Sequence, residues 1–271
     1  MARSFAISVV LSCLATSAWT QTQPAQAPAT APIAKPAVKK PAPKVQAAKK
    51  PDSGPCGIGL IAATGDLFTV QKIGLTMFNI DYAEVPVPWG FDDLIFARVR
   101  AAAGGTPVRR ITYAKGAFDS YYHPQPKLFR NSREELTNLV RQIAGNAGCE
   151  RYLVVIRLNG QLHGTNQALT GVGILNHGTS LFSRTYLFAY IRVIAFDGQT
   201  FEMRRDPSAT FEGALANIAA NLTKNENMRE LDDSAFPASP SEAANSPALR
   251  DGARDLLTQK LDKILPAYFK E

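Results

Sequence analysis

The hydrophobic and polar positions beyond about residue 54 alternate between strand-like runs and helical stripes. Thr64-Gly65-Asp66-Leu67 separates the first two apolar runs and predicts that they form a hairpin. Asp197-Gly198 predicts a type I′ turn after the longest run, because this dipeptide tolerates the positive φ angles of such turns. Strands or extended segments are expected over residues 57–63, 68–78, 85–88, 108–113, 152–158, 186–196 and 200–204.

Apolar residues at three- and four-residue spacing predict helices over residues 91–102, 132–147, 206–222 and 246–265. Ser132 and Glu135 match the capping-box pattern at the start of the second helix. The third helix would bury Phe211, Leu215, Ile218 and Leu222. The last two helices would open with Asp206-Pro207 and Ser246-Pro247, a cap residue followed by proline. A surface loop over residues 232–245 would join these two helices.

The order of these elements predicts the α+β class. We expect a single globular domain over residues 54–271, in which helices pack against a mixed β-sheet. The helix over 132–147 connects the strands at 108–113 and 152–158, which implies a parallel crossover. Beyond residue 53 no apolar run reaches the ~20 residues that a membrane-spanning helix needs. We therefore expect no transmembrane helix in the mature chain.

Residues 1–53 have a different composition and predict an export signal followed by a tether. A positive start at residues 1–3, an apolar run over 5–15 and small residues near 18–20 are typical of a signal peptide, here residues 1–20. Residues 21–53 are rich in Pro, Ala and Lys and carry few large side chains. Such a segment buries too little apolar surface to fold, so we expect a disordered linker.

The net charge of +7 lies almost entirely in this N-terminal part. Residues 1–53 hold Arg3 and six lysines against Asp52, which leaves the predicted domain nearly neutral. This distribution argues against a nucleic-acid partner. The lysines serve either as a solvated spacer or as a weak electrostatic contact with anionic lipid or envelope polymer.

The three cysteines lie at informative places. Cys56 and Cys149 each precede an apolar strand, so parallel neighbouring strands would bring both to one edge of the sheet. A disulfide is then reasonable in an oxidising compartment, and two free buried thiols are the alternative. Cys13 lies in the signal, where Val10-Leu11-Ser12-Cys13 has the outline of a lipoprotein cleavage box. Cys13 is either an ordinary signal-peptide residue or the site of a lipid anchor in the outer membrane.

Three features resemble a family of envelope lipoprotein domains. These features are Ala147-Gly148-Cys149-Glu150-Arg151-Tyr152 at the entry to a strand, the long strand and turn over 191–200, and a late helix. The family includes the curli-secretion lipoprotein, the penicillin-binding-protein activator lipoproteins and the N-terminal domain of the Tol-system translocation protein. The resemblance spans residues 57–222 and implies an envelope domain with a protein partner.

The sequence offers little catalytic chemistry. His123, His163 and His177 lie in predicted loops, and their spacing is not that of metal ligands. No nucleophile elbow and no complete dinucleotide-binding glycine motif occurs, so we expect no cofactor. Asp92-Asp93 and Asp232-Asp233 are explained by a helix start and a solvated loop. An enzyme that uses His163 or His177 with loop acids remains an alternative.

Residues 164–183 carry no charge and are rich in Gly, Thr and Asn. They predict a long hairpin or flap between strands, or else a contact surface for a partner or for self-association. The sequence therefore favours an exported periplasmic protein whose tethered domain binds an envelope protein or cell-wall partner without catalysis. An oligomeric secretion component that uses residues 164–183 is the second alternative, and the oligomeric state is open.

Overall fold

The computed structural model describes residues 54–74, 80–126, 129–162, 167–178, 182–207 and 226–270. The predicted signal peptide, with Cys13, and the predicted tether lie outside the described residues. So do His163 and residues 208–225, which make up most of the helix expected over 206–222.

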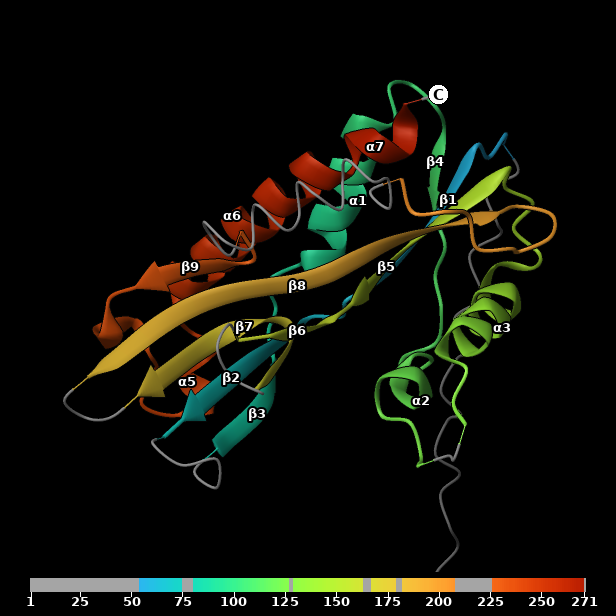
Figure 1. The fold of residues 1–271 in the computed structure, drawn as a ribbon. Coiled ribbons are helices and arrows are strands. Elements are labelled where there is room, and N and C mark those ends of the chain that lie inside the picture. The colour runs from blue at the N-terminus through green and yellow to red at the C-terminus, as the bar shows by residue number, and fades with distance from the viewer. Residues whose placement is uncertain are drawn as a thin grey trace, which may run out of the picture. The chain divides into compact units, whose positions relative to one another are not determined.

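The described residues form one curled, mixed sheet with helices packed against it, which confirms the α+β class (Figure 1). The strand order is β3-β2-β7-β8-β5-β1-β4, while β6 pairs with β7 and β9 pairs with β8. The strands are β1 (Ile58–Ala63), β2 (Leu67–Ile73), β3 (Ile80–Pro86), β4 (Val108–Arg110), β5 (Arg151–Arg157), β6 (Asn159–Gln161), β7 (Ala168–Gly178), β8 (Ser183–Asp197) and β9 (Met228–Leu231). The helices are α1 (Phe91–Ala102), α2 (Asp119–Tyr122), α3 (Ser132–Ala144), η1 (Asp233–Ala235), α5 (Pro240–Ala243), α6 (Pro247–Ile264) and α7 (Pro266–Phe269).

The long strand β8 is shared by two halves of the sheet (Figure 1). Its first part pairs antiparallel with β7, and its last part, from Ile191 onward, pairs antiparallel with β5. Leu158, just after β5, donates its N–H to the carbonyl of Tyr190, where the two pairings meet. One half of the sheet therefore contains β5, β1 and β4, and the other contains β7, β2 and β3.

The predicted hairpin between the first two strands is wrong. β1 pairs with β4 and β5, whereas β2 pairs with β3 and β7. β1 runs parallel to β5, and β2 runs parallel to β7. Because β5 and β7 are both antiparallel to β8, they run in the same direction. The chain therefore continues in the same direction through residues 64–66 and passes from one half of the sheet to the other. The expected parallel relation of β4 and β5 is confirmed, because β1 lies parallel to both.

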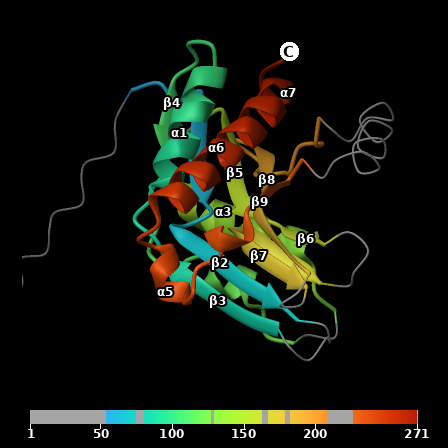
Figure 2. The same ribbon diagram turned by 90° about the vertical axis from the view of Figure 1, so that its left-hand side faces the viewer.

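Helices cover one face of both halves of the sheet (Figure 2). α1, α5 and α6 contribute Phe91, Ala243, Leu257 and Leu261 to a core with residues of β1, β2, β5, β7 and β8. On the opposite face, α3 packs Leu136 and Val140 against β1 and β5. A third, smaller cluster over β7 and β8 includes Leu162, which follows β6, and Leu169 of β7.

Two local predictions need correction. The cap of α3 is Asn131, whose Oδ1 accepts a hydrogen bond from the N–H of Glu134 at 3.2 Å, so the Ser132–Glu135 capping box is wrong. The turn after β8 is not a two-residue type I′ turn, because Gly198 lacks a positive φ and Phe201 has one, at 59°. The Asp197 carboxylate instead accepts hydrogen bonds from the following N–H groups, and the Phe201 ring stacks on Tyr152 with centroids 5.3 Å apart.

The C-terminal part agrees better with expectation. Ser246 caps α6 as predicted and accepts a hydrogen bond from the N–H of Leu249 at 3.3 Å. The expected loop over 232–245 contains η1 and α5, and the unforeseen strand β9 precedes it. Within the described residues, none of the helices is both long enough and apolar enough to span a bilayer.

Candidate functional site

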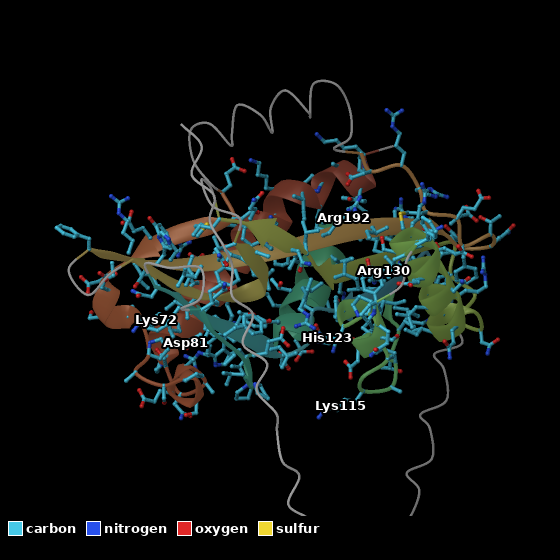
Figure 3. The ribbon with its side chains drawn as sticks, turned by 60° about the horizontal axis from the view of Figure 1, so that its bottom comes forward. Lys72, Asp81, Lys115, His123, Arg130 and Arg192 are labelled. Atoms are coloured by element: carbon cyan, nitrogen blue, oxygen red, sulfur yellow. A yellow bond between two sulfur atoms is a disulfide. The ribbon has the colours of Figure 1, made fainter. Side chains whose placement is uncertain are left out.

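The histidines that can be placed lie on different elements. His123 is exposed at the C-terminal end of α2 (Figure 3), and His177 lies near the end of β7 opposite Arg184 of β8. In the described ranges, no three side chains of His, Cys, Asp or Glu are grouped so that they could hold a metal ion. The two histidines that can be placed therefore belong to separate parts of the fold, one after α2 and one on β7.

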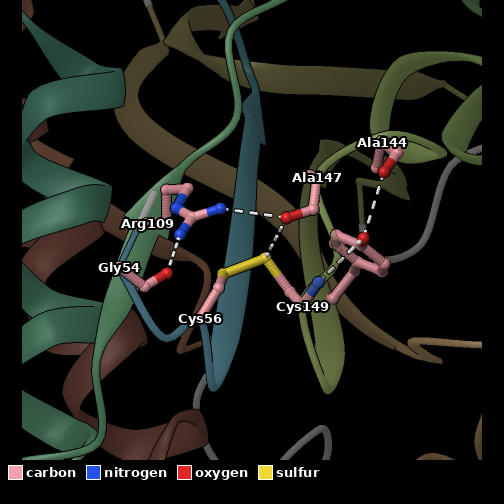
Figure 4. The surroundings of a disulfide bond; sticks show 7 residues. Gly54, Cys56, Arg109, Ala144, Ala147 and Cys149 are labelled. Atoms are coloured by element: carbon pink, nitrogen blue, oxygen red, sulfur yellow. Dashed lines mark hydrogen bonds between the residues drawn. A yellow bond between two sulfur atoms is a disulfide. The ribbon is translucent and has the colours of Figure 1, made fainter. Parts of the chain in front are cut away.

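Cys56 and Cys149 are brought together, and their Sγ atoms lie at disulfide distance (Figure 4). Their Cα atoms are 4.6 Å apart, and both residues are buried at the amino ends of β1 and β5. This confirms the predicted pairing, because the two strands are parallel neighbours. The Arg109 guanidinium donates to the carbonyls of Gly54 and Ala147, and the Tyr152 hydroxyl donates to that of Ala144, which ties the surrounding loops to the bridge.

The uncharged segment proves to be mostly an interior strand. Residues 168–178 form β7, which is hydrogen-bonded to β2 on one side and to β8 on the other. Most of its side chains are buried, which explains why the segment carries no charge. The interpretation as a free edge for a partner is therefore wrong for these residues, and the interpretation as one arm of a long hairpin with β8 is confirmed.

The paired acids point apart, as expected. Asp93 forms an exposed ion pair with Arg110 at 2.6 Å, whereas Asp92 accepts a hydrogen bond from the Thr64 hydroxyl at 2.8 Å. Asp232 caps the η1 turn through the N–H of Ser234. Burial raises the pKa of Asp92 to about 6, and the nearby Asp66 carboxylate adds to this effect.

We expect Asp92→Asn to raise the free energy of unfolding by about 1–2 kcal/mol at pH 8. The pKa of Asp92 in the folded chain, about 6, exceeds its ordinary value of 3.8, so folding favours the protonated form. The cost of the buried carboxylate is fully present above pH 6 and disappears as the pH falls toward 4. Urea denaturation at pH 4.5 and pH 8 should show a clearly larger gain at pH 8. Asp93→Asn is the matched control, and equal effects of the two variants would contradict the assignment.

The carboxyl ends of the parallel strands β1 and β5 carry a second polar group of residues. The Tyr122 hydroxyl donates to the carbonyl of Ala63 at 2.5 Å and accepts from the N–H of Arg157 at 3.2 Å. The Tyr113 hydroxyl donates to the carbonyl of Ala62 at 2.6 Å. Burial raises the pKa of Tyr122 to about 12. These hydroxyls satisfy strand ends where the chain leaves one half of the sheet.

Arg157 is the centre of this group. Its side chain is 6% exposed, its Nη1 lies 2.6 Å from Glu84 Oε1, and its guanidinium lies 4.2 Å from the centroid of the Tyr122 ring. Gly171 leaves room for it: with φ at 70°, a Cβ there would lie 3.0 Å from Arg157 Cδ. The buried pair thus connects the end of β5 to β3, two strands that do not pair. We call Tyr82, Glu84, Tyr122 and Arg157 the polar junction.

The tyrosine hydroxyls of this region have hydrogen-bond partners, whereas two other buried polar atoms do not. Tyr82 donates its hydroxyl to Glu84 Oε1 at 2.9 Å, and burial followed by this hydrogen bond raises the pKa of Tyr82 to about 12. Arg157 Nε and the nearby buried Gln71 Oε1 have no hydrogen-bond partner among the described residues. The sequence did not indicate the polar junction, although an arginine that closes the apolar run at 152–158 is a usable signal.

The chain matches no protein-family model, no curated protein and no solved structure.

Proposed function

We propose that this chain is an exported cell-envelope protein in which a Pro/Ala/Lys-rich tether presents an α+β domain to a protein or cell-wall partner. The observation that carries the proposal is the disulfide between Cys56 and Cys149. Such bridges persist in oxidising compartments and are rare in the cytosol. The signal-like pattern of residues 1–20 and the resemblance to envelope lipoprotein domains support the same location in the cell envelope.

The chemistry of the polar junction favours binding over catalysis. Its tyrosine hydroxyls donate to main-chain carbonyls or to Glu84, and the charge of Arg157 is balanced by that carboxylate. A general acid or nucleophile must be free to exchange a proton with a substrate. Groups committed to holding strands together are better explained as a scaffold, so the domain is proposed to act through its surface.

The proposed tether would set how far the domain can lie from the point where the chain is held. If residues 21–53 are extended, at ~3.1 Å per residue they span up to about 100 Å. That length suits presentation through a cell-wall mesh or across a periplasm. In-cell photo-crosslinking from exposed positions of the domain, followed by mass spectrometry, would identify the partner.

Export is tested by trapping thiols in intact bacterial cells that produce the full chain. We expect Cys56 and Cys149 to resist a maleimide–polyethylene glycol reagent until a reductant is added, because both sulfurs are bonded in an oxidising compartment. Leu11→Arg, which interrupts the apolar run of the signal, should leave both thiols reactive in the cytosol. Free thiols in the wild-type chain, recovered folded, would contradict the proposal. Cys13→Ser, assayed by membrane fractionation, separates lipidation from simple release.

A further inference from the structure

β3 is an edge strand, and among the described residues no strand pairs with its outer side. It is hydrogen-bonded to β2 in an antiparallel ladder of seven residue pairs. Ile80 and Tyr82 are 37% and 52% exposed, and both are among the large hydrophobic residues that are exposed in the described part of the chain. The other sheet edges are shorter, because β4 has three residues and β9 has four. Long, exposed edge strands with apolar side chains are typical sites of strand addition.

One hydrogen bond shows which residues of β3 bond to β2 and which direct their main-chain groups outward. Val87 donates its N–H to the carbonyl of Asp66 at 2.8 Å, which continues the β2–β3 register by one pair. In an antiparallel ladder only alternate residues bond to the partner, so residues 81, 83 and 85 bond to β2. Ile80, Tyr82 and Glu84 consequently direct their N–H and C=O groups outward. Pro86 and Pro88 share this outward direction and offer no donor, so the open ladder ends at Glu84.

We propose that two copies of this chain associate through β3, antiparallel and centred on Tyr82. In this register Tyr82 faces Tyr82 of the second copy, and Ile80 faces Glu84 of the second copy. The three outward residues of each strand would then exchange about six N–H···O=C bonds. A two-fold axis at Tyr82 makes the contact self-complementary, so it closes as a dimer and does not continue as a fibre.

The charges of β3 are compatible with a second copy. Glu84 is paired with Arg157 inside its own chain at 2.6 Å, and Asp81 lies opposite Lys72 of β2 (Figure 3). Across the two-fold axis Asp81 faces Ala83, so no two like charges are directly opposed. The facing tyrosines add an aromatic cross-strand pair, which stabilises antiparallel strands. The dimer requires neither export nor a further partner, so it stands or falls separately from the proposed function.

Light scattering and sedimentation of the purified full-length protein test the dimer. We expect a dimer at micromolar concentrations, and we expect Tyr82→Pro to weaken it by at least about ten-fold because the outward N–H at the centre is removed. This variant should fold, since the N–H of Tyr82 does not bond to β2. Lys72→Ala, on the neighbouring strand, is the control that should leave the mass unchanged. A wild-type protein that stays monomeric at about 100 μM would overturn the proposal.

The register has its own test. Facing residues of a hydrogen-bonded antiparallel pair have Cα atoms ~5.5 Å apart, within the range of a disulfide. Tyr82→Cys should therefore cross-link two copies under mild oxidation, whereas Ile80→Cys should not. Efficient cross-linking through Ile80→Cys and none through Tyr82→Cys would refute the register. Circular dichroism of each variant shows that it is folded before its mass is interpreted.

Discussion

Replacing Cys56 and Cys149 together by alanine is expected to lower the free energy of unfolding by about 4 kcal/mol. The bridge closes a loop across a sequence separation of 93 residues, and its loss frees the unfolded chain over that whole span. The native state should change little, because the backbone around the bridge is also held by Arg109 and Tyr152. Urea denaturation at neutral pH measures the difference directly.

The wild-type protein in excess reductant is the control, and it should match the double variant. A domain of this size loses roughly 2–4 °C of melting temperature for each kcal/mol, so the drop should be about 8–16 °C. A loss below about 1 kcal/mol would mean that β1 and β5 hold the two loops without the bridge.

Replacing Arg157 by methionine is expected to cost about 3 kcal/mol, since removal of one partner leaves a buried charge unpaired. Methionine keeps most of the side-chain volume, so the loss reports the ion pair with Glu84 and the contact with the Tyr122 ring. Glu84→Gln should be similarly costly, because the side chain of Arg157 is only 6% exposed. Urea denaturation of both variants and of the double variant closes a thermodynamic cycle.

In that cycle the double variant should be more stable than the sum of the two losses predicts, by at least about 1 kcal/mol. Arg229→Met provides the matched control: Arg229 pairs with Asp255 at 2.8 Å, but the two side chains are 35% and 53% exposed. Its loss should stay below about 1 kcal/mol. Additive losses at Arg157 and Glu84 would show that the two side chains do not act as a pair.

The sequence predicted the local elements well and their pairing poorly. The strand and helix over 57–63 and 91–102 lie where the apolar patterns placed them, because burial sets those patterns. The strand is buried along its whole length and reads as a continuous apolar run, whereas the helix is buried on one face and shows helical spacing. Thr64-Gly65-Asp66, by contrast, is a sequence that suits both a hairpin turn and a bend after which the chain continues in the same direction. Only the long-range alignment of β5 and β7 along β8 decides between the two, and no local signal encodes that alignment.

The candidate site shows the same division. Cys56 and Cys149 could be paired because each precedes a strand and cysteines are few. The contact of Arg157 with Glu84 joins residues 73 positions apart on strands that are not neighbours, so no spacing could indicate it. The uncharged residues 164–183 predicted either a long hairpin or a contact surface, because a strand paired on both sides lacks charges for the same reason that a contact surface does. The pairing of β7 with β8 confirms the hairpin.

The place of the disulfide has a mechanical consequence. Cys56 lies two residues after Gly54, where the described domain begins, and the bond to Cys149 joins β1 to β5 at that point. Tension that arrives along the preceding chain therefore enters two neighbouring interior strands at once. The load is shared by the whole β1–β5 ladder and, through β5, by β8, so it does not fall on one strand alone.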